Sequence, residues 1–306
     1  MSTSAWAVTT GEMGMRTQAR GLAEAVADAV AELTVGSWPW SGPKPTPPWP
    51  TVIVSCGRRS ARWALAARKA SGGSSFAVHV QDPRRDADAF DLIVAMAHDA
   101  IAAGGNVIKV TTALHDLTPA KLETAAKAWA DRLAPLGRPL TGVAIGGDLR
   151  GRAFTLADGA RLVEGLRRVR AGTGGALAIT PSRRTPAATL AQLKTAFGDD
   201  PRVFLWDREG DNPYRAILAA SDRLVVTSDS VSMISEALAT GHPVDVFGEP
   251  QNARHARFLR TLLDDGLIAP FTGEAVTPRE APPVDATGDA AQAVRALLEA
   301  RTGMVL

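Results

Sequence analysis

Residues 223–244 read Arg-Leu-Val-Val-Thr-Ser-Asp-Ser-Val-Ser-Met-Ile-Ser-Glu-Ala-Leu-Ala-Thr-Gly-His-Pro-Val. The apolar run 223–227 is typical of a buried parallel strand, and the small hydroxylated residues after it are typical of a helix start. Gly241 and Pro243 end the helix, and a second apolar run follows at 244–247. This stretch predicts a strand–helix–strand unit, the building block of α/β folds with parallel sheets.

The helix start in this stretch has the properties of an anion site. A helix that opens at the carboxyl end of a buried strand presents free backbone N–H groups and the positive end of its dipole, which suits phosphate or pyrophosphate. One to two turns further on, the carboxylate of Glu236 is placed to reach ribose hydroxyls. The alternative is an ordinary strand–helix–strand unit in which a Ser or Asp only caps the helix. The predicted binding residues here are Ser228, Ser230, Val231, Ser232 and Glu236.

Strands and helices alternate along all 306 residues, which indicates parallel sheets with helices on both faces. The predicted strands are Ala5–Thr9, Val52–Ser55, Phe76–Val80, Leu92–Ala95, Val107–Val110, Gly142–Ile145, Ala176–Thr180, Val203–Leu205, Leu224–Thr227 and Val244–Phe247. The predicted helices include Thr17–Leu33, Arg59–Lys69, Pro119–Leu133, Leu156–Val169, Pro186–Phe197 and Pro213–Ala219, with a last helix near Thr287–Arg301. Ten strands are many for one open sheet, so we expect two sheets.

The polar segment 134–139, which carries two prolines and a glycine, is the natural place to divide the chain. The expected fold class is α/β, with two doubly wound Rossmann-like domains. They cover residues 1–136 and 137–284, and the C-terminal helix within 285–306 is expected to pack back on the first domain.

Composition excludes several classes of protein. A net charge of +2 with 22% charged residues argues against a nucleic-acid partner. The single cysteine, Cys56, excludes an internal disulfide framework and a Cys-rich metal site. No apolar run reaches the ~18 residues of a membrane span, and no signal peptide precedes the first predicted strand. We therefore expect a cytoplasmic protein.

Two further strand ends in the second half carry candidate binding residues. Gly146 and Gly147 lack side chains and would let a backbone approach a diphosphate closely. Ser182, Arg183 and Arg184 follow the strand 176–180, where ligands bind in parallel sheets, and an arginine fork matches phosphate geometry. The alternatives are a simple turn for the glycines and a solvated surface for the arginines.

The first half offers two candidate general bases. Glu12 lies in the glycine turn after the first strand, and His98 follows the strand 92–95 beside Asp99. For both, a plain polar turn is the alternative. No metal site is expected, because Asp86 and Asp88 are spaced as Asp-x-Asp but belong to a polar turn.

The chain resembles the family named after the plant mitochondrial-fission "elongated mitochondria" (Elm) protein, and more distantly the GT-B glycosyltransferases. The resemblance covers nearly the whole chain. Its most specific parts are the Ser-Arg-Arg-Thr-Pro run at 182–186 and the helix with Ser235-Glu236 that ends in Gly-His-Pro. The other matching segments are Gly21–Ala25, Ser55–Arg59, Gln81–Arg84, Phe90–Ile93, Ile145–Gly147 and Asn212–Tyr214. The resemblance implies two domains that face each other across a cleft, with the donor bound by the second.

The resemblance implies a metal-independent glycosyltransferase that takes a nucleotide-diphosphate sugar as donor and needs no cofactor. A non-hydrolysing nucleotide-sugar 2-epimerase on the same scaffold is the first alternative. The NAD-dependent type is excluded because Leu218, not a lysine, follows the only tyrosine, Tyr214, by four residues. A non-catalytic organiser or adaptor is the second alternative, because Met15 stands where the family usually has a His.

Trp38, Trp40 and Trp49 alternate with prolines in the segment 36–50. Aromatic side chains with a polar edge suit a lipid interface, so this segment predicts a lipid-linked or membrane-proximal acceptor and a peripheral position on the inner membrane face. A Pro-Trp loop packed on its own domain is the alternative.

Overall fold

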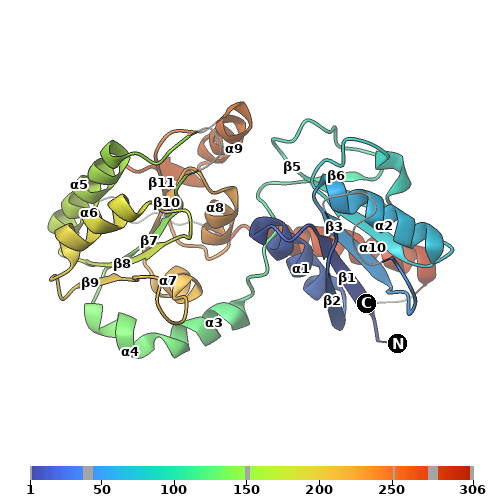
Figure 1. Ribbon diagram of the computed structural model, residues 1–306, viewed down its shortest axis with the longest axis horizontal. Helices are drawn as coiled ribbons and strands as arrows, with labels where there is room; N and C mark the ends of the chain where they lie inside the picture. Colours follow the sequence, from blue (N-terminus) through green and yellow to red (C-terminus); the bar gives the residue numbers. More distant parts are fainter. Residues whose placement is uncertain (1, 37–43, 149–151, 251, 275–281, 304–306) are drawn as a thin grey trace. The chain divides into compact units, whose positions relative to one another are not determined.

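The computed structural model describes residues 2–36, 44–148, 152–250, 252–274 and 282–303. The chain forms two compact units, each with its own sheet (Figure 1). Unit 1 comprises Met1–Asp116 together with Asp285–Leu306, and unit 2 comprises Leu117–Val284.

Unit 1 is built on a six-stranded parallel sheet of order β2-β1-β3-β4-β5-β6. Its strands are β1 (Ser4–Thr9), β2 (Ala29–Thr34), β3 (Val52–Cys56), β4 (Phe76–Val80), β5 (Leu92–Met96) and β6 (Val107–Val110). Its helices are α1 (Met13–Val26), α2 (Arg58–Ala70), the short η1 (Ala87–Ala89) and α10 (Ala286–Thr302). The central strands β3, β4 and β5 are buried at every position, as expected for a parallel sheet covered on both faces.

The predicted helix 17–33 is wrong in its second half. Helix α1 ends at Val26, and residues 29–34 form strand β2, which pairs in parallel with β1 from Ser4 to Thr9. Asp28 fixes the tight turn between them by accepting the Thr3 N–H at 2.8 Å. Strand β2 lies at the sheet edge and is half-exposed to exposed throughout, so its sequence lacks the apolar run of a buried strand.

Unit 2 has a second six-stranded parallel sheet, of order β12-β11-β10-β7-β8-β9. Its strands are β7 (Leu140–Ile145), β8 (Ala176–Pro181), β9 (Val203–Leu205), β10 (Arg223–Thr227), β11 (Val244–Phe247) and β12 (Ile268–Pro270). Its helices are α3 (Pro119–Ala128), α4 (Ala130–Leu133), η2 (Ala134–Leu136), α5 (Leu156–Thr173), α6 (Ala187–Phe197), α7 (Tyr214–Ala220), α8 (Val231–Leu238) and α9 (Ala253–Asp264). Strand β12 reads Ile-Ala-Pro, so its sequence lacks the apolar run that reveals the equally short β9.

Alternate side chains of the unit 2 strands enter two cores. Val143 and Val225 pack with α5 and α6 on one face, while Ala144 and Val226 pack with α8 and α9 on the other. The sheet is therefore sandwiched between helices, and its strand ends are left to carry the functional loops.

The structure divides the chain before α3, not within 134–139. Leu117 joins the core of unit 2, and α3 contacts α7. The prolines and glycine of 134–139 interrupt a helical connection instead, and Leu136 is buried in the same unit. In unit 1, α10 packs on α1, and the Thr287 hydroxyl both accepts from the His115 N–H and donates to the His115 carbonyl.

Strand order reverses once in each sheet, between β1 and β3 in unit 1 and between β7 and β10 in unit 2. Ligands of doubly wound proteins bind outside the carboxyl ends of the strands at this reversal. Within the described ranges, no helix combines the length and apolar character that crossing a bilayer requires.

Candidate functional site

The reversal point of unit 2 brings together the turns that follow β7, β8 and β10. The turn after β7 contains Gly146 and Gly147, the turn after β8 contains Ser182–Thr185, and the turn after β10 contains Ser228–Ser230. Most of the residues predicted for nucleotide binding therefore lie in one cluster. Its centre, however, is Asp229, a residue that the sequence suggested only as a helix cap.

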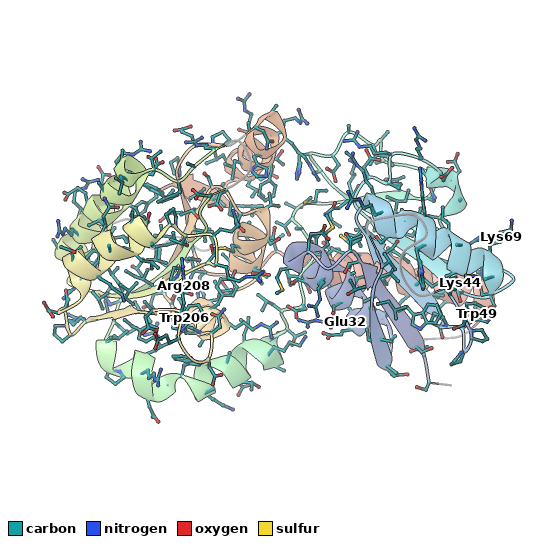
Figure 2. The ribbon with its side chains drawn as sticks, in the orientation of Figure 1. Glu32, Lys44, Trp49, Lys69, Trp206 and Arg208 are labelled. Carbon is teal, nitrogen blue, oxygen red and sulfur yellow. The ribbon has the colours of Figure 1, made fainter. Side chains whose placement is uncertain are left out.

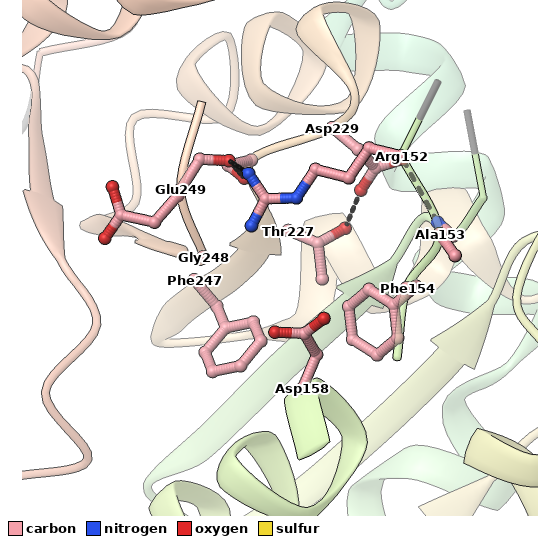
Figure 3. A pocket seen from close by; sticks show the side chains of 11 residues that line it. Arg152, Ala153, Phe154, Asp158, Thr227, Asp229, Phe247, Gly248 and Glu249 are labelled. Atoms are coloured by element: carbon pink, nitrogen blue, oxygen red, sulfur yellow. Dashed lines mark hydrogen bonds between the residues drawn. The ribbon is translucent and has the colours of Figure 1, made fainter. Parts of the chain in front are cut away.

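Asp229 is a buried carboxylate with three donors, one of which, Thr227, is labelled beside it in Figure 3. One oxygen accepts the Thr227 hydroxyl at 2.5 Å. The other accepts the Gly147 N–H at 3.1 Å and an Arg184 guanidinium nitrogen at 2.8 Å. The Thr227 hydroxyl in turn accepts the Gly146 N–H at 2.7 Å. One carboxylate thus links the ends of β7, β8 and β10.

The two glycines are required by this packing. A Cβ on Gly146 would lie 2.0 Å from an Asp229 carboxylate oxygen, and a Cβ on Gly147 would lie 2.0 Å from the Arg184 carbonyl oxygen. Both glycine N–H groups also donate inside the protein. We expected these glycines to let a diphosphate approach the backbone. In the structure, the space beside them is filled by Asp229 and by the Arg184 backbone instead.

The turn after β8 is held in the same way. The Ser182 hydroxyl donates to the Gly146 carbonyl at 2.9 Å, and Arg184 donates to the Asp148 carbonyl at 3.1 Å. Arg208, which Figure 2 labels with Trp206 after β9, donates to the Thr185 carbonyl. Arg183 is exposed and makes no hydrogen bond or ion pair with another residue of the described ranges. The charge of Arg184 is therefore already paired, and that of Arg183 is open to a ligand.

The start of α8 keeps two donors open. The Ser230 hydroxyl accepts the Met233 N–H at 3.3 Å, and the Ser228 hydroxyl donates to the Glu249 carbonyl at 2.8 Å. Among the described residues, none accepts from the backbone N–H groups of Val231 and Ser232. These two groups point along the helix dipole and are suited to an anion.

Glu236 has a partner that the sequence did not suggest. The Tyr214 hydroxyl donates to one Glu236 carboxylate oxygen at 2.5 Å, and both side chains are half-buried. Burial raises the pKa of Glu236, although the tyrosine hydrogen bond and Arg215 oppose that rise. Burial and the Glu236 charge raise the pKa of Tyr214. The second carboxylate oxygen has no partner within the described ranges and is available to a hydroxyl donor.

A small cavity lies beside Asp229 and is crossed by the side chain of Arg152 (Figure 3). Its volume of about 20 Å³ accommodates a water molecule rather than a nucleotide. Arg152 donates to the Glu249 and Pro250 carbonyls at 3.4 and 3.3 Å, so no carboxylate neutralises it there. A larger groove of about 550 Å³ runs between α5 and the ends of β11 and β12 and shares Phe247 and Glu249 with the cavity.

The two candidate bases of unit 1 lie apart. Glu12 caps α1 at the end of β1 and accepts the Thr10 hydroxyl at 2.5 Å. His98 is buried after β5, with its Nε2 4.0 Å from an Asp99 oxygen. Strands β3 and β4 separate β1 from β5, which places the two turns roughly 14 Å apart at ordinary strand spacing. The two residues therefore do not form one acid–base pair.

At the reversal point of unit 1, Met15 packs on the turn after β3. A Cβ on Gly57, which has a φ of 91°, would lie 2.5 Å from the Met15 sulfur. The thioether thus fills the space beside Gly57, at the position where the resemblance led us to expect a His. Trp38 and Trp40 lie outside the described residues, and Trp49 packs on Trp6 with ring centroids 6.0 Å apart (Figure 2). No group of three or more His, Cys, Asp or Glu suited to a metal ion occurs in the described ranges.

Two solved structures share the whole fold. The UDP-GlcNAc 2-epimerase from Neisseria meningitidis, solved with UDP-GlcNAc, is 11% identical with a TM-score of 0.53 and covers 95% of this chain and 98% of its own. The MurG of Acinetobacter baumannii is 12% identical with a TM-score of 0.52 and covers 97% and 92%. At these identities the likeness concerns the fold alone, which is that of a GT-B-like α/β protein.

Relatives found by sequence have a higher sequence identity to this chain. A sequence model described as "Mitochondrial fission ELM1" matches residues 13–298. The Arabidopsis thaliana "Mitochondrial fission protein ELM1" is 32% identical over 277 residues, which are 82% of this chain and 65% of the plant protein. This chain therefore spans less than two thirds of that relative. Because the sequence model matches nearly the whole of it, the chain belongs to the Mitochondrial fission ELM1 family.

Proposed function

We propose that unit 2 binds a nucleotide-diphosphate sugar at the start of α8 and that the protein is a metal-independent glycosyltransferase of GT-B type. The observation that carries this proposal is the combination of two open N–H groups, at Val231 and Ser232, with the open carboxylate oxygen of Glu236 on the same helix.

The spacing along α8 supports this assignment. Glu236 lies four to five residues after the open N–H groups, which is about 6–7.5 Å along a helix axis. Within one nucleoside diphosphate, that span suits a phosphate at the helix start and ribose hydroxyls at the carboxylate. The leaving diphosphate would be stabilised by the helix dipole and Arg183, with a smaller contribution from Arg184 because Asp229 already pairs it.

Non-hydrolysing epimerisation at C2 of a nucleotide sugar is the second candidate. The observation in its favour is that the Neisseria UDP-GlcNAc 2-epimerase, which was solved with UDP-GlcNAc, is similar in fold to nearly the whole of this chain. An organiser or adaptor that keeps the pocket without turnover is the third, and it is favoured by Met15 in the reversal point of unit 1.

For a transferase, Glu12 or His98 would take the acceptor proton. A lipid-linked acceptor at the inner membrane face remains a proposal based on the Pro-Trp segment.

Calorimetric titration with UDP, GDP and ADP tests the proposal. We expect one of them to bind, and Val231→Pro to weaken its binding at least three-fold. Proline is tolerated in the first turn of a helix and removes only the N–H group there. Leu156→Pro, the equivalent first position of α5, is the matched control and should leave binding unchanged.

Binding that Val231→Pro does not alter, or the absence of binding by any of the three nucleotides at millimolar concentration, would contradict the proposal. The candidates are then separated by turnover. Incubation with UDP-GlcNAc in D₂O gives deuterium at C2 only for an epimerase, and release of UDP that depends on an added acceptor occurs only for a transferase.

A further inference from the structure

The carboxylate of Asp229 has the surroundings of a bound phosphate. Anion sites at glycine turns combine backbone N–H groups, hydroxyls and cationic side chains. Asp229 receives one of each: the Gly147 N–H, the Thr227 hydroxyl and the Arg184 guanidinium. These donors come from three different strand ends, and they converge on a side chain whose exposed fraction is only 4%.

The turn is shaped around this carboxylate. Both Asp229 oxygens lie within 2.2 Å of the position that a Gly146 Cβ would occupy, so only glycine fits while Asp229 is in place. The Arg184 ion pair neutralises the buried charge, and a ligand phosphate approaching the same donors would meet a negative group already bound to them.

We propose that Asp229 is a resident anion of the glycine turn, by which we mean that its carboxylate permanently fills an anion site formed by the protein's own donors. It occupies the donors that would otherwise receive a ligand phosphate, and it thereby confines the ligand's phosphates to the open N–H groups of α8; only this second part rests on the proposed function. Asp229 also disfavours ligands that place additional negative charge at the turn, so it acts as a specificity-determining residue for the charge of the ligand.

Inorganic phosphate and pyrophosphate are suitable probes because they need neither a base nor a sugar subsite. We expect Asp229→Ala to bind phosphate at least ten-fold more tightly than the wild type, measured by titration calorimetry and by the rise of the melting temperature with phosphate concentration. Arg184→Gln in the Asp229→Ala background should abolish the gain, because it removes the cationic donor.

Asp245→Ala is the matched control. Asp245 is equally buried and paired with an arginine, Arg223, in the same sheet, but it lies within strand β11 rather than in a turn after a strand. This variant should gain no phosphate affinity. If Asp229→Ala fails to fold, Asp229→Ser also removes the carboxylate from the donors, and added phosphate should raise its melting temperature more than that of the wild type.

A folded Asp229→Ala or Asp229→Ser variant that binds phosphate no better than the wild type overturns the resident-anion proposal. A gain of the same size in Asp245→Ala overturns it as well, because the effect would then follow net charge. Failure of the wild type to bind nucleotides contradicts only the proposed function, since the phosphate experiment uses no nucleotide.

Discussion

Replacing Gly146 with alanine inserts a methyl group where Asp229 already stands. The new Cβ would lie 2.0 and 2.2 Å from the two carboxylate oxygens, whereas ordinary contacts begin at 3.4 Å. The carboxylate must therefore retreat by about 1.4 Å, which is enough to break hydrogen bonds that are now 3.1 Å to Gly147 and 2.8 Å to Arg184.

The cost can be worked out from these contacts. Leaving the buried Gly147 N–H without an acceptor costs about 1–3 kcal/mol. Overpacking a closely packed position costs about 1–3 kcal/mol more. The Arg184 ion pair adds at most about 1 kcal/mol, because that side chain is 38% exposed and water screens it. We expect about 4 kcal/mol, near the middle of the summed range, or roughly 8–16 °C in the melting temperature for a unit of this size.

Differential scanning calorimetry measures the effect on the unit 2 transition. Gly210→Ala is the control, since nothing lies within 4 Å of its Cβ and only the strain of its φ of 67° remains, about 1 kcal/mol. Asp229→Ala removes the obstructing carboxylate, so the double variant with Gly146→Ala should be destabilised by less than the sum of the single changes. A Gly146→Ala protein that melts within about 2 °C of the wild type would refute the placement of Asp229 against the glycine.

Three further predictions concern acidity and metal. Because burial raises the pKa of Glu236 in the folded protein, its carboxylate takes up a proton at a higher pH than an exposed glutamate does, so nucleotide affinity should fall as the solution is acidified. Glu236→Gln should bind more weakly and without this pH dependence in calorimetric titrations. Burial lowers the pKa of His79 from 6.5 to about 4, so the unfolded chain binds the extra proton in that window, and stability is lost as pH falls through it. The loss should be about 3 kcal/mol by urea denaturation. His79→Leu combined with Ser55→Ala, which removes both partners of the 2.8 Å hydrogen bond, should flatten this slope; an unchanged slope would exclude His79 as its source. Any turnover of a nucleotide sugar should persist in EDTA, because the helix start and Arg183 carry positive charge; activity that disappears with chelator and returns with Mg²⁺ would contradict the metal-independent assignment.

The sequence predicts the strands well where burial leaves a pattern. All ten predicted strands are present. Most of them are apolar runs because they are buried, and the half-exposed edge strand β9 is apolar as well, with the sequence Val-Phe-Leu. The missed strands lack that pattern: β2 is an edge strand with half-exposed to exposed residues, and the edge strand β12 reads Ile-Ala-Pro.

The candidate site was predictable in its position but not in its contacts. Strand-end turns can be placed from the alternation of elements, so Gly146, Arg184 and Ser230 were correctly expected at strand ends. The acceptor of the Gly147 N–H is Asp229, 82 residues further along the chain. The partner of Glu236 is Tyr214, from another helix. Such pairings depend on how the strands are ordered, which no local pattern encodes.

The return of α10 to unit 1 has a consequence for biosynthesis. The buried side of α10, which includes Ala290, Val294 and Leu298, packs in a unit whose sheet comes entirely from the first 110 residues. During translation, unit 2 leaves the ribosome before α10, so it can complete its core while α1 still has an uncovered apolar surface. The first unit can therefore be completed only after α10 has been synthesised. We expect the protein to be most prone to aggregation between the synthesis of β6 and that of α10.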